Sequence, residues 1–201
     1  MLMRRLAALA LAGVLALVLL AGCGQKPAEQ GSSSSQSAQA EAFYSFTDDS
    51  GREVSLESQP QRVVALMGSY AETWMLAGGV PVGVTEDVIS ERGLTVGEET
   101  KVIGTVKGPS TEEILNLDPD FILLSTDVAE HVELDGMLTQ AGIPHAYFKV
   151  ENFEDYLNML KICTDLTGRA DLYEENGIAV QAQIDAILEK VQENRPEEQP
   201  T

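Results

Sequence analysis

The side chains best able to do chemistry are few in this sequence and lie far apart. They include two histidines, His131 and His145, and two cysteines, Cys23 and Cys163. Neither histidine has a second metal ligand nearby in the sequence, so we expect surface or capping histidines and no metal site. Cys163 lies in an apolar helical stretch, where a lone cysteine is usually a small buried hydrophobe. Because the sequence contains no catalytic or cofactor-binding motif, we predict that the chain is not an enzyme and holds no cofactor.

A second group of polar residues follows short apolar runs that we expect to be parallel strands. Ligands of open parallel sheets bind outside the carboxyl ends of the strands. The loops at those ends contain the candidate ligand-binding residues Ser69, Tyr70, Lys107, Thr126 and Asp127. Helix N-termini that begin at these loops offer free backbone N–H groups, and Lys107 adds a cation that suits an anionic ligand group. Each residue is about as well explained as a helix cap or a solvated loop side chain, so both interpretations stay open.

The elements that would position these residues predict an α/β fold, a Rossmann-like lobe with a parallel sheet flanked by helices. The predicted strands are rich in Val, Ile, Leu and aromatic residues and span 62–67, 80–85, 101–105, 121–125 and 145–150. Helical periodicity occupies the segments 70–77, 111–117, 129–141 and 153–167. Glycines directly follow three of these segments, as they follow many helices. The connections are short, as βα units require.

Further elements precede and follow the sheet. Apolar-rich segments within residues 43–56 flank Asp48-Asp49-Ser50-Gly51, which predicts a small β-hairpin. Turn chemistry explains its acidic pair better than metal binding does. Residues 169–194 are predicted to form a long amphipathic helix, in which Gly177 costs roughly 1 kcal/mol relative to alanine. We therefore assign residues 41–168 to the α/β lobe and residues 195–201 to a loose tail.

The N-terminal residues have the layout of an export signal. In residues 1–22, two arginines precede an uncharged apolar run that is short for a permanent membrane span. The run ends in Leu20-Ala21-Gly22-Cys23, which resembles the lipobox of bacterial lipoproteins and implies lipid attachment to Cys23. Residues 23–40 then form a flexible tether. We expect the chain on the outer face of the bacterial cytoplasmic membrane or in the periplasm, with the lipid anchor as its only contact with the membrane.

The charge of the chain is strongly negative. There are 13 lysines and arginines against 32 aspartates and glutamates, a formal net charge of −19. Such a surface repels nucleic acid and anionic lipid, so we expect no nucleic-acid partner. A cationic ligand is permitted by this charge, but acidic surfaces mostly keep proteins soluble.

Several stretches, taken in order, resemble the substrate-binding lipoproteins of ABC importers for iron-siderophores, heme and cobalamin. They are residues 46–54, 61–66, 71–72, 81–84, 102–104, 110–123 and 141–144. No single stretch is diagnostic, but together they extend over residues 43 to about 194. The resemblance implies two α/β lobes joined by one long helix, with the ligand in the cleft between them. Residues 169–194 are similar to that joining helix, and the preceding residues to the N-terminal lobe.

The resemblance also implies partners. The family docks on its permease subunits through an acidic residue on each lobe, and the first-lobe position resembles Glu112. Stabilisation of the helix N-terminus, worth about 0.3–1 kcal/mol, is the alternative role of Glu112. The implied ligand is a small-molecule metal chelate. We rank a ferric siderophore ahead of heme or cobalamin, because Tyr70 offers the only ring among the loop residues considered, with Asp87, Val106 and Ser125 at the other rim positions.

The second lobe of the family has no counterpart in this sequence. We therefore expect the first half of an importer receptor, either truncated or encoded apart from its other half. A single lobe should bind ligand weakly, because a pocket normally surrounds about 70–90% of a small ligand. The competing hypothesis is a lipid-tethered single-lobe interaction module that docks on a permease without ligand. An enzyme of flavodoxin-like architecture ranks third.

Overall fold

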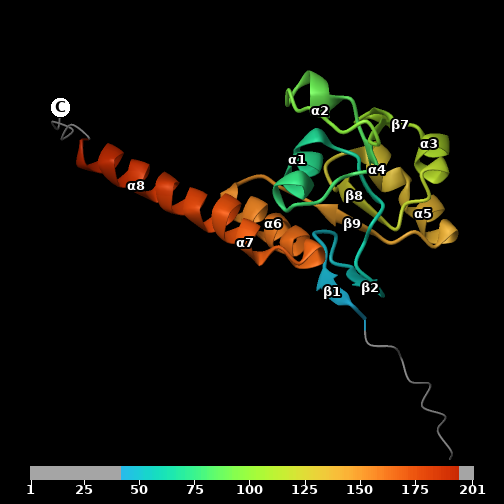
Figure 1. Ribbon diagram of the computed structural model, residues 1–201, viewed down its shortest axis with the longest axis horizontal. Coiled ribbons are helices and arrows are strands. Elements are labelled where there is room, and N and C mark those ends of the chain that lie inside the picture. Colours follow the sequence, from blue (N-terminus) through green and yellow to red (C-terminus); the bar gives the residue numbers. More distant parts are fainter. Residues whose placement is uncertain (1–41, 195–201) are drawn as a thin grey trace, which may run out of the picture. The chain divides into compact units, whose positions relative to one another are not determined.

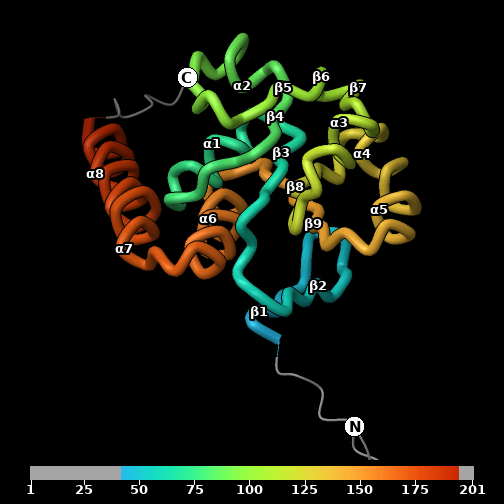
Figure 2. Tube along the Cα trace, turned by 45° about the vertical axis from the view of Figure 1, so that its right-hand side comes forward, coloured from blue at the N-terminus to red at the C-terminus, as the bar shows by residue number. Residues whose placement is uncertain are grey.

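A five-stranded parallel sheet lies at the centre of residues 42–194, the part of the chain that this computed structural model describes. Its strand order is β5-β4-β3-β8-β9 (Figure 1; β3, β4 and β5 are labelled in Figure 2). The strands are β3 (Val63–Ala65), β4 (Gly83–Val84), β5 (Lys101–Val102), β8 (Phe121–Ser125) and β9 (His145–Phe148). Each lies within one of the five predicted runs. The predicted α/β fold class is therefore confirmed.

Side chains of the sheet alternate between two apolar cores, because successive residues of a strand point to opposite faces. On β3, Val63 and Ala65 belong to one core and Val64 to the other. Helices α1 (Gly68–Leu76) and α6 (Phe153–Thr167) cover the first face, and α3 (Thr111–Asn116) and α5 (Asp135–Ala141) the second (Figure 2). Cys163 lies fully buried in the first core, as predicted, and burial raises the pKa of its thiol to about 12.

Several helix ends lie where local residues predict them. Asn152 begins α6 with a capping box, in which its side chain accepts the N–H of Asp155 while the Asp155 carboxylate accepts the N–H of Asn152. At the other end, Gly168 adopts a left-handed conformation with φ of 72°. The predicted boundaries of this helix are confirmed.

Other elements differ from the prediction. The expected helix 129–141 is divided into α4 (Ala129–Glu133) and α5, because the carbonyl of His131 accepts bonds from Leu134 N at 3.2 Å and from the Tyr147 hydroxyl at 3.1 Å. The expected strand 101–105 ends early, and the chain turns at Gly104, whose φ is 116°, into a ribbon of β6 (Gly104–Thr105) and β7 (Gly108–Pro109). Helix α2 (Asp87–Ser90) was not predicted, since a single turn carries no periodicity.

The predicted hairpin is confirmed as β1 (Tyr44–Thr47) and β2 (Glu53–Leu56), an antiparallel pair. Its turn covers the outer edge of β9. Tyr147 N donates to Asp48 Oδ2 at 3.1 Å, Asp49 N donates to Tyr147 O at 2.9 Å, and Lys149 N donates to Asp49 Oδ2 at 2.7 Å. The turn thus satisfies an edge that would otherwise present free backbone groups to another chain.

A helical stretch follows the lobe and comprises α7 (Ala170–Tyr173), the π-helix η1 (Glu174–Ile178) and α8 (Ala179–Glu193) (Figure 1). It occupies the position predicted for one long helix. The π-turn contains Gly177, where a Cβ atom would lie only 3.0 Å from Leu157 Cδ2, so glycine permits close packing on α6. Beyond it, α8 exposes apolar side chains, among them Ile187, Leu188 and Val191.

Some predictions fall outside the described residues. These are the signal peptide 1–22, the tether 23–40 with lipid attachment at Cys23, and the tail 195–201. Among residues 42–194, no helix combines the length and apolar character needed to cross a membrane.

Candidate functional site

The carboxyl edge of the sheet contains a point where strand order reverses. After β3 the chain continues to β4 and β5 on one side, and after β8 it continues to β9 on the other. The loops that leave β3 and β8 therefore diverge, and this is where open α/β sheets bind ligands. Asp87, which is 8% exposed, joins the chain after β3 to the chain after β4 by accepting bonds from Gly68 N at 2.7 Å and from Thr85 Oγ1 at 2.6 Å.

Tyr70 links α1 to the ends of two strands. Its hydroxyl donates to Phe148 O at 2.8 Å and lies 3.3 Å from Ser125 Oγ. Only 3% of the residue is exposed, and burial is the main reason that its pKa is raised to about 12. The phenol is therefore neutral and already hydrogen-bonded, and its main role in this structure is to fix the position of α1 at the carboxyl edge.

His131 was expected at the surface or in a cap, and that expectation is wrong, because the residue is fully buried. Its Nδ1 accepts the N–H of Ser125 at 3.1 Å, and its Nε2 lies 2.9 Å from Val106 O. These partners require an acceptor at Nδ1 and a donor at Nε2, which together define one neutral tautomer. Burial lowers the pKa of His131, in agreement with a neutral ring. The ring ties the end of β8 to the β6–β7 ribbon.

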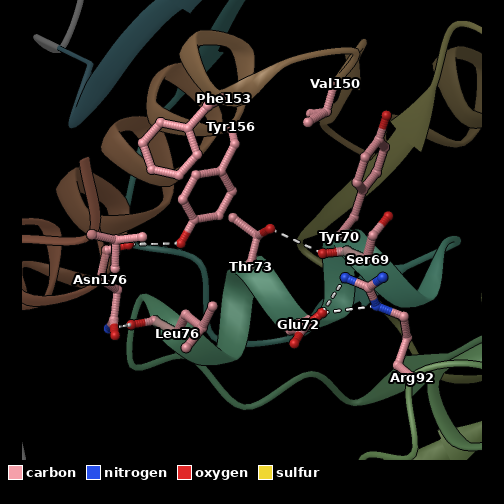
Figure 3. Close-up of a pocket in the computed structure, with 11 residues that line it drawn as sticks. Ser69, Tyr70, Glu72, Thr73, Leu76, Arg92, Val150, Phe153, Tyr156 and Asn176 are labelled. Carbon is pink, nitrogen blue, oxygen red and sulfur yellow. Dashed lines mark hydrogen bonds and ion pairs between the residues drawn. The ribbon is translucent and has the colours of Figure 1, made fainter. Parts of the chain in front are cut away.

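An apolar groove runs along α1, from Ser69 to Leu76. Its volume is about 420 Å³, and its lining residues come from α1, α6, η1 and α8 and from two loops (Figure 3). The walls are formed mainly by aliphatic and aromatic side chains, those of Leu76, Val150, Phe153, Tyr156 and Val180. Such a volume lies within the range of about 300–1,000 Å³ that is typical of small-molecule sites.

Hydrogen bonds hold the far wall of the groove in place. Tyr156 Oη donates to Asn176 O at 3.0 Å, and Asn176 Nδ2 donates to Leu76 O at 2.9 Å (Figure 3). Since Leu76 is the last residue of α1, these two bonds join α6, η1 and α1 around the groove. Burial, with the negative charge of Glu72 as a secondary cause, raises the pKa of Tyr156.

Glu72 and Arg92 are the two charged residues among those that line the groove. Arg92 Nε donates to Glu72 Oε2 at 2.8 Å, and Arg92 Nη2 donates to the same oxygen (Figure 3). Glu72 belongs to α1, whereas Arg92 lies in the loop after α2. Nothing in the local pattern of residues points to Arg92, because its loop carries no periodicity or motif.

The predicted ligand-binding residues lie at the same edge of the sheet but in different hollows. Ser69 and Tyr70 line the groove. Thr126 lines a second hollow of about 520 Å³ with Arg52 and Tyr147, and Lys107 lines a third of about 300 Å³ beside Asp87. Asp127 is exposed and lines none of these three, although its N–H donates to Ser125 Oγ at 3.2 Å.

Two further assignments concern Glu112 and metal binding. Glu112 is exposed in the first turn of α3, a helix capped by Ser110, so it is accessible and also favourably placed at a helix N-terminus.

Among residues 42–194, no three His, Cys, Asp or Glu side chains are grouped so that they could hold a metal ion.

Comparison with known proteins identifies the family of this chain. A family model described as periplasmic binding protein matches residues 63–201. The chain is 32% identical over 147 residues to YvrC of Bacillus subtilis (strain 168), an uncharacterized ABC transporter substrate-binding lipoprotein. This match covers 70% of the chain and 44% of YvrC.

Solved structures share the fold. The siderophore-binding protein BauB, bound to two acinetobactin molecules and ferric iron, has a TM-score of 0.62 at 19% identity, over 76% of this chain and 55% of that protein. A periplasmic heme-binding protein from Pseudomonas aeruginosa has a TM-score of 0.57 at 21% identity, with coverages of 68% and 50%. The chain thus spans about half the length of these relatives.

Proposed function

Because the chain belongs to the periplasmic binding protein family, we propose that it is the solute-binding component of an ABC importer. The family consists of binding proteins, so the chain is not an enzyme. In this proposal the protein captures a metal chelate outside the cell membrane and delivers it to the permease subunits. Signal peptide 1–22, lipid at Cys23 and the tether 23–40 would keep the lobe, residues 41–168, near the importer.

The observation that supports this proposal most directly is the groove at the carboxyl edge of the sheet. It combines apolar walls with a few polar groups, as small-molecule sites do. Ser69 and Tyr70, in the first turn of α1 shortly after β3, are the two predicted ligand-binding residues that line this groove. Lys107, Thr126 and Asp127 would contact only a ligand that extends along the edge toward the other hollows.

We propose a ferric siderophore as the ligand, with heme or cobalamin as alternatives. The groove adds Phe153 and Tyr156 from α6 to the ring of Tyr70. A tetrapyrrole would therefore contact more aromatic surface in this groove than the loop residues alone provide. A volume of about 420 Å³ still suits a compact chelate, or part of a larger ligand that is shared with a second lobe.

The experiment that tests the ligand class is a thermal shift series. The full chain is mixed with ferric hydroxamate, ferric catecholate, heme or cobalamin, and the melting temperature is measured against ligand concentration. We expect a ferric chelate to raise the melting temperature. A rise with heme or cobalamin alone would reverse the ranking, and no rise with any of the four would contradict chelate binding by this lobe.

We further propose that residues 169–194 are the inter-lobe helix of a receptor whose second lobe packs against α8. The exposed Ile187, Leu188 and Val191 support this, because contiguous apolar side chains on a soluble protein usually mark an interaction surface. The second lobe would come from the same receptor or from a separately encoded chain. Glu112, exposed on α3, would dock on the permease, and residues 195–201 would form the tail of this portion.

The alternative function is a lipid-tethered interaction module that docks on a permease without carrying ligand. It is favoured by the exposed position of Glu112, which is independent of the groove. Co-purification of the chain with permease subunits distinguishes the two. Retention of the permease in the absence of every chelate supports the module, whereas retention that depends on a chelate supports the receptor.

A further inference from the structure

Arg92 lines the groove and uses only some of its hydrogen-bond donors in its ion pair with Glu72. Both hydrogen bonds of Arg92 to Glu72 end on Oε2 and come from Nε and Nη2. Within residues 42–194, the structure places no hydrogen bond on Arg92 Nη1 or on Glu72 Oε1. An arginine has five N–H donors in a planar fork, so Arg92 retains an unused donor edge.

The position of this edge makes it available to a ligand. The Arg92 side chain is 45% exposed and that of Glu72 is 31% exposed. Arg92 lines the groove together with Ser69, Tyr70 and Glu72, and in Figure 3 its guanidinium is joined to Glu72 through Nε and Nη2. Since Glu72 is held on α1, it orients the guanidinium while leaving Nη1 of this lining residue without a hydrogen bond among residues 42–194.

The rest of the groove defines what else the ligand must contain. Apart from Glu72 and Arg92, the lining consists of uncharged residues, and its walls are mostly aliphatic or aromatic. The chain as a whole carries a formal charge of −19, so an anion is repelled at long range and needs a local cation to bind. Arg92 is the cation that lines this groove.

We propose that Arg92 recognises an anionic group of the ligand, a carboxylate or a comparably compact oxyanion, while the apolar walls hold an aromatic or aliphatic body. Glu72 is the positioning residue that orients Arg92, and it also weakens the attraction because it offsets the positive charge. This inference rests on the proposed function and specifies the charge of the ligand.

The test compares three ferric chelates of different charge on the full chain. The probes are an anionic dihydroxybenzoate complex, an uncharged trihydroxamate complex, and a hydroxamate complex carrying a protonated amine. Affinity is measured by NMR titration, which detects weak binding. We expect Arg92→Gln to weaken binding of the anionic chelate at least about tenfold, the effect of losing a charge-assisted hydrogen bond.

The opposite substitution should act in the opposite direction. Glu72→Gln keeps an oxygen that can accept from Arg92 but removes the competing charge. It should therefore strengthen binding of the anionic chelate by roughly two- to fivefold, the scale of an exposed ion pair. Neither substitution should change affinity for the uncharged chelate. Arg169→Gln, which removes an exposed arginine paired with Asp171 outside the groove, is the matched control and should leave all three affinities unchanged.

Each remaining outcome overturns the inference. Unchanged anion binding in Arg92→Gln with an unaltered melting temperature contradicts it, as does loss of anion binding in Lys107→Gln alone. Preference for the cationic chelate, abolished by Glu72→Gln, would assign recognition to Glu72 instead. If only the uncharged chelate binds, the inference fails while the proposed function stands, and if none binds, both fail.

Discussion

Asp48 is a single carboxylate that joins the hairpin turn to the sheet. Its side chain is fully buried, and it accepts hydrogen bonds from Ser50, Arg52 and Tyr147. Burial acts to raise the pKa of Asp48, but these hydrogen bonds outweigh it, and the pKa is lowered. The charged form is therefore the one that stabilises the fold.

The pH dependence of stability follows from the direction of this pKa shift. Because the pKa of Asp48 is lower in the folded than in the unfolded state, its contribution is present above about pH 4 and is lost as the pH falls through the folded pKa. We expect Asp48→Asn to lower the free energy of unfolding by about 2–4 kcal/mol at pH 7 and to flatten its decline below about pH 4.

Urea unfolding at a series of pH values measures both effects. Asp49→Asn is the matched control, since the exposed Asp49 carboxylate accepts one backbone bond, from Lys149, and should contribute about 1 kcal/mol. Equal losses in the two variants, or an unchanged pH profile in Asp48→Asn, would show that Asp48 does not have this role.

Among the elements, η1 joins the C-terminal helical stretch to the lobe by hydrogen bonds of Asn176 and by the packing of Gly177 on α6. Asn176 in η1 joins it to α1 through Leu76 O and to α6 through the Tyr156 hydroxyl. α8 has no buried residue, so little else holds that helix to the lobe. The direction of α8 is therefore set mainly at η1.

Asn176→Ala should loosen this junction without unfolding the sheet. Loss of the bond to Leu76 O should destabilise the protein by about 1 kcal/mol and speed amide hydrogen exchange in α7, η1 and α8. Exchange in β3 and β8 should stay slow. Asn194→Ala removes a side-chain bond within the last turn of α8 and is the control. Faster exchange throughout the sheet would contradict a local role.

At the scale of the whole molecule, substitutions on the exposed face of α8 should affect assembly with a second lobe but not the folding of this chain. Ile187 is 60% exposed, so Ile187→Glu should change the free energy of unfolding of this chain by less than about 0.5 kcal/mol. Leu166→Ala, in the fully buried core, should lower it by about 2–5 kcal/mol.

The same surface variant tests the proposed second lobe. If another lobe packs on α8, Ile187→Glu should abolish its association with this chain, measured by analytical ultracentrifugation of the mixture. Lys161→Gln, a substitution of an exposed side chain on α6 that pairs with Asp165, should leave association intact. Unimpaired association in Ile187→Glu would show that the second lobe uses another surface.

Local pattern was enough to define much of the fold. Strands such as β8 are continuous apolar runs, and helices such as α6 have a cap at Asn152 and a glycine at position 168, so each is specified by residues adjacent in the chain. The family is likewise indicated by short stretches of sequence that follow one another in the order typical of its members. The short α2 and the β6–β7 ribbon escaped prediction, because elements of a few residues show no period.

The sequence by itself thus determined the fold class, the family and the edge of the sheet at which to look for a site. Only the tertiary structure decided that Tyr70 and His131 are buried and hydrogen-bonded, and that Arg92 meets Glu72 beside a groove. The reason is physical: periodicity and caps act between near neighbours. Burial and ion pairing depend on where the sheet brings α1, α6 and the loop after α2, and no local pattern encodes those positions.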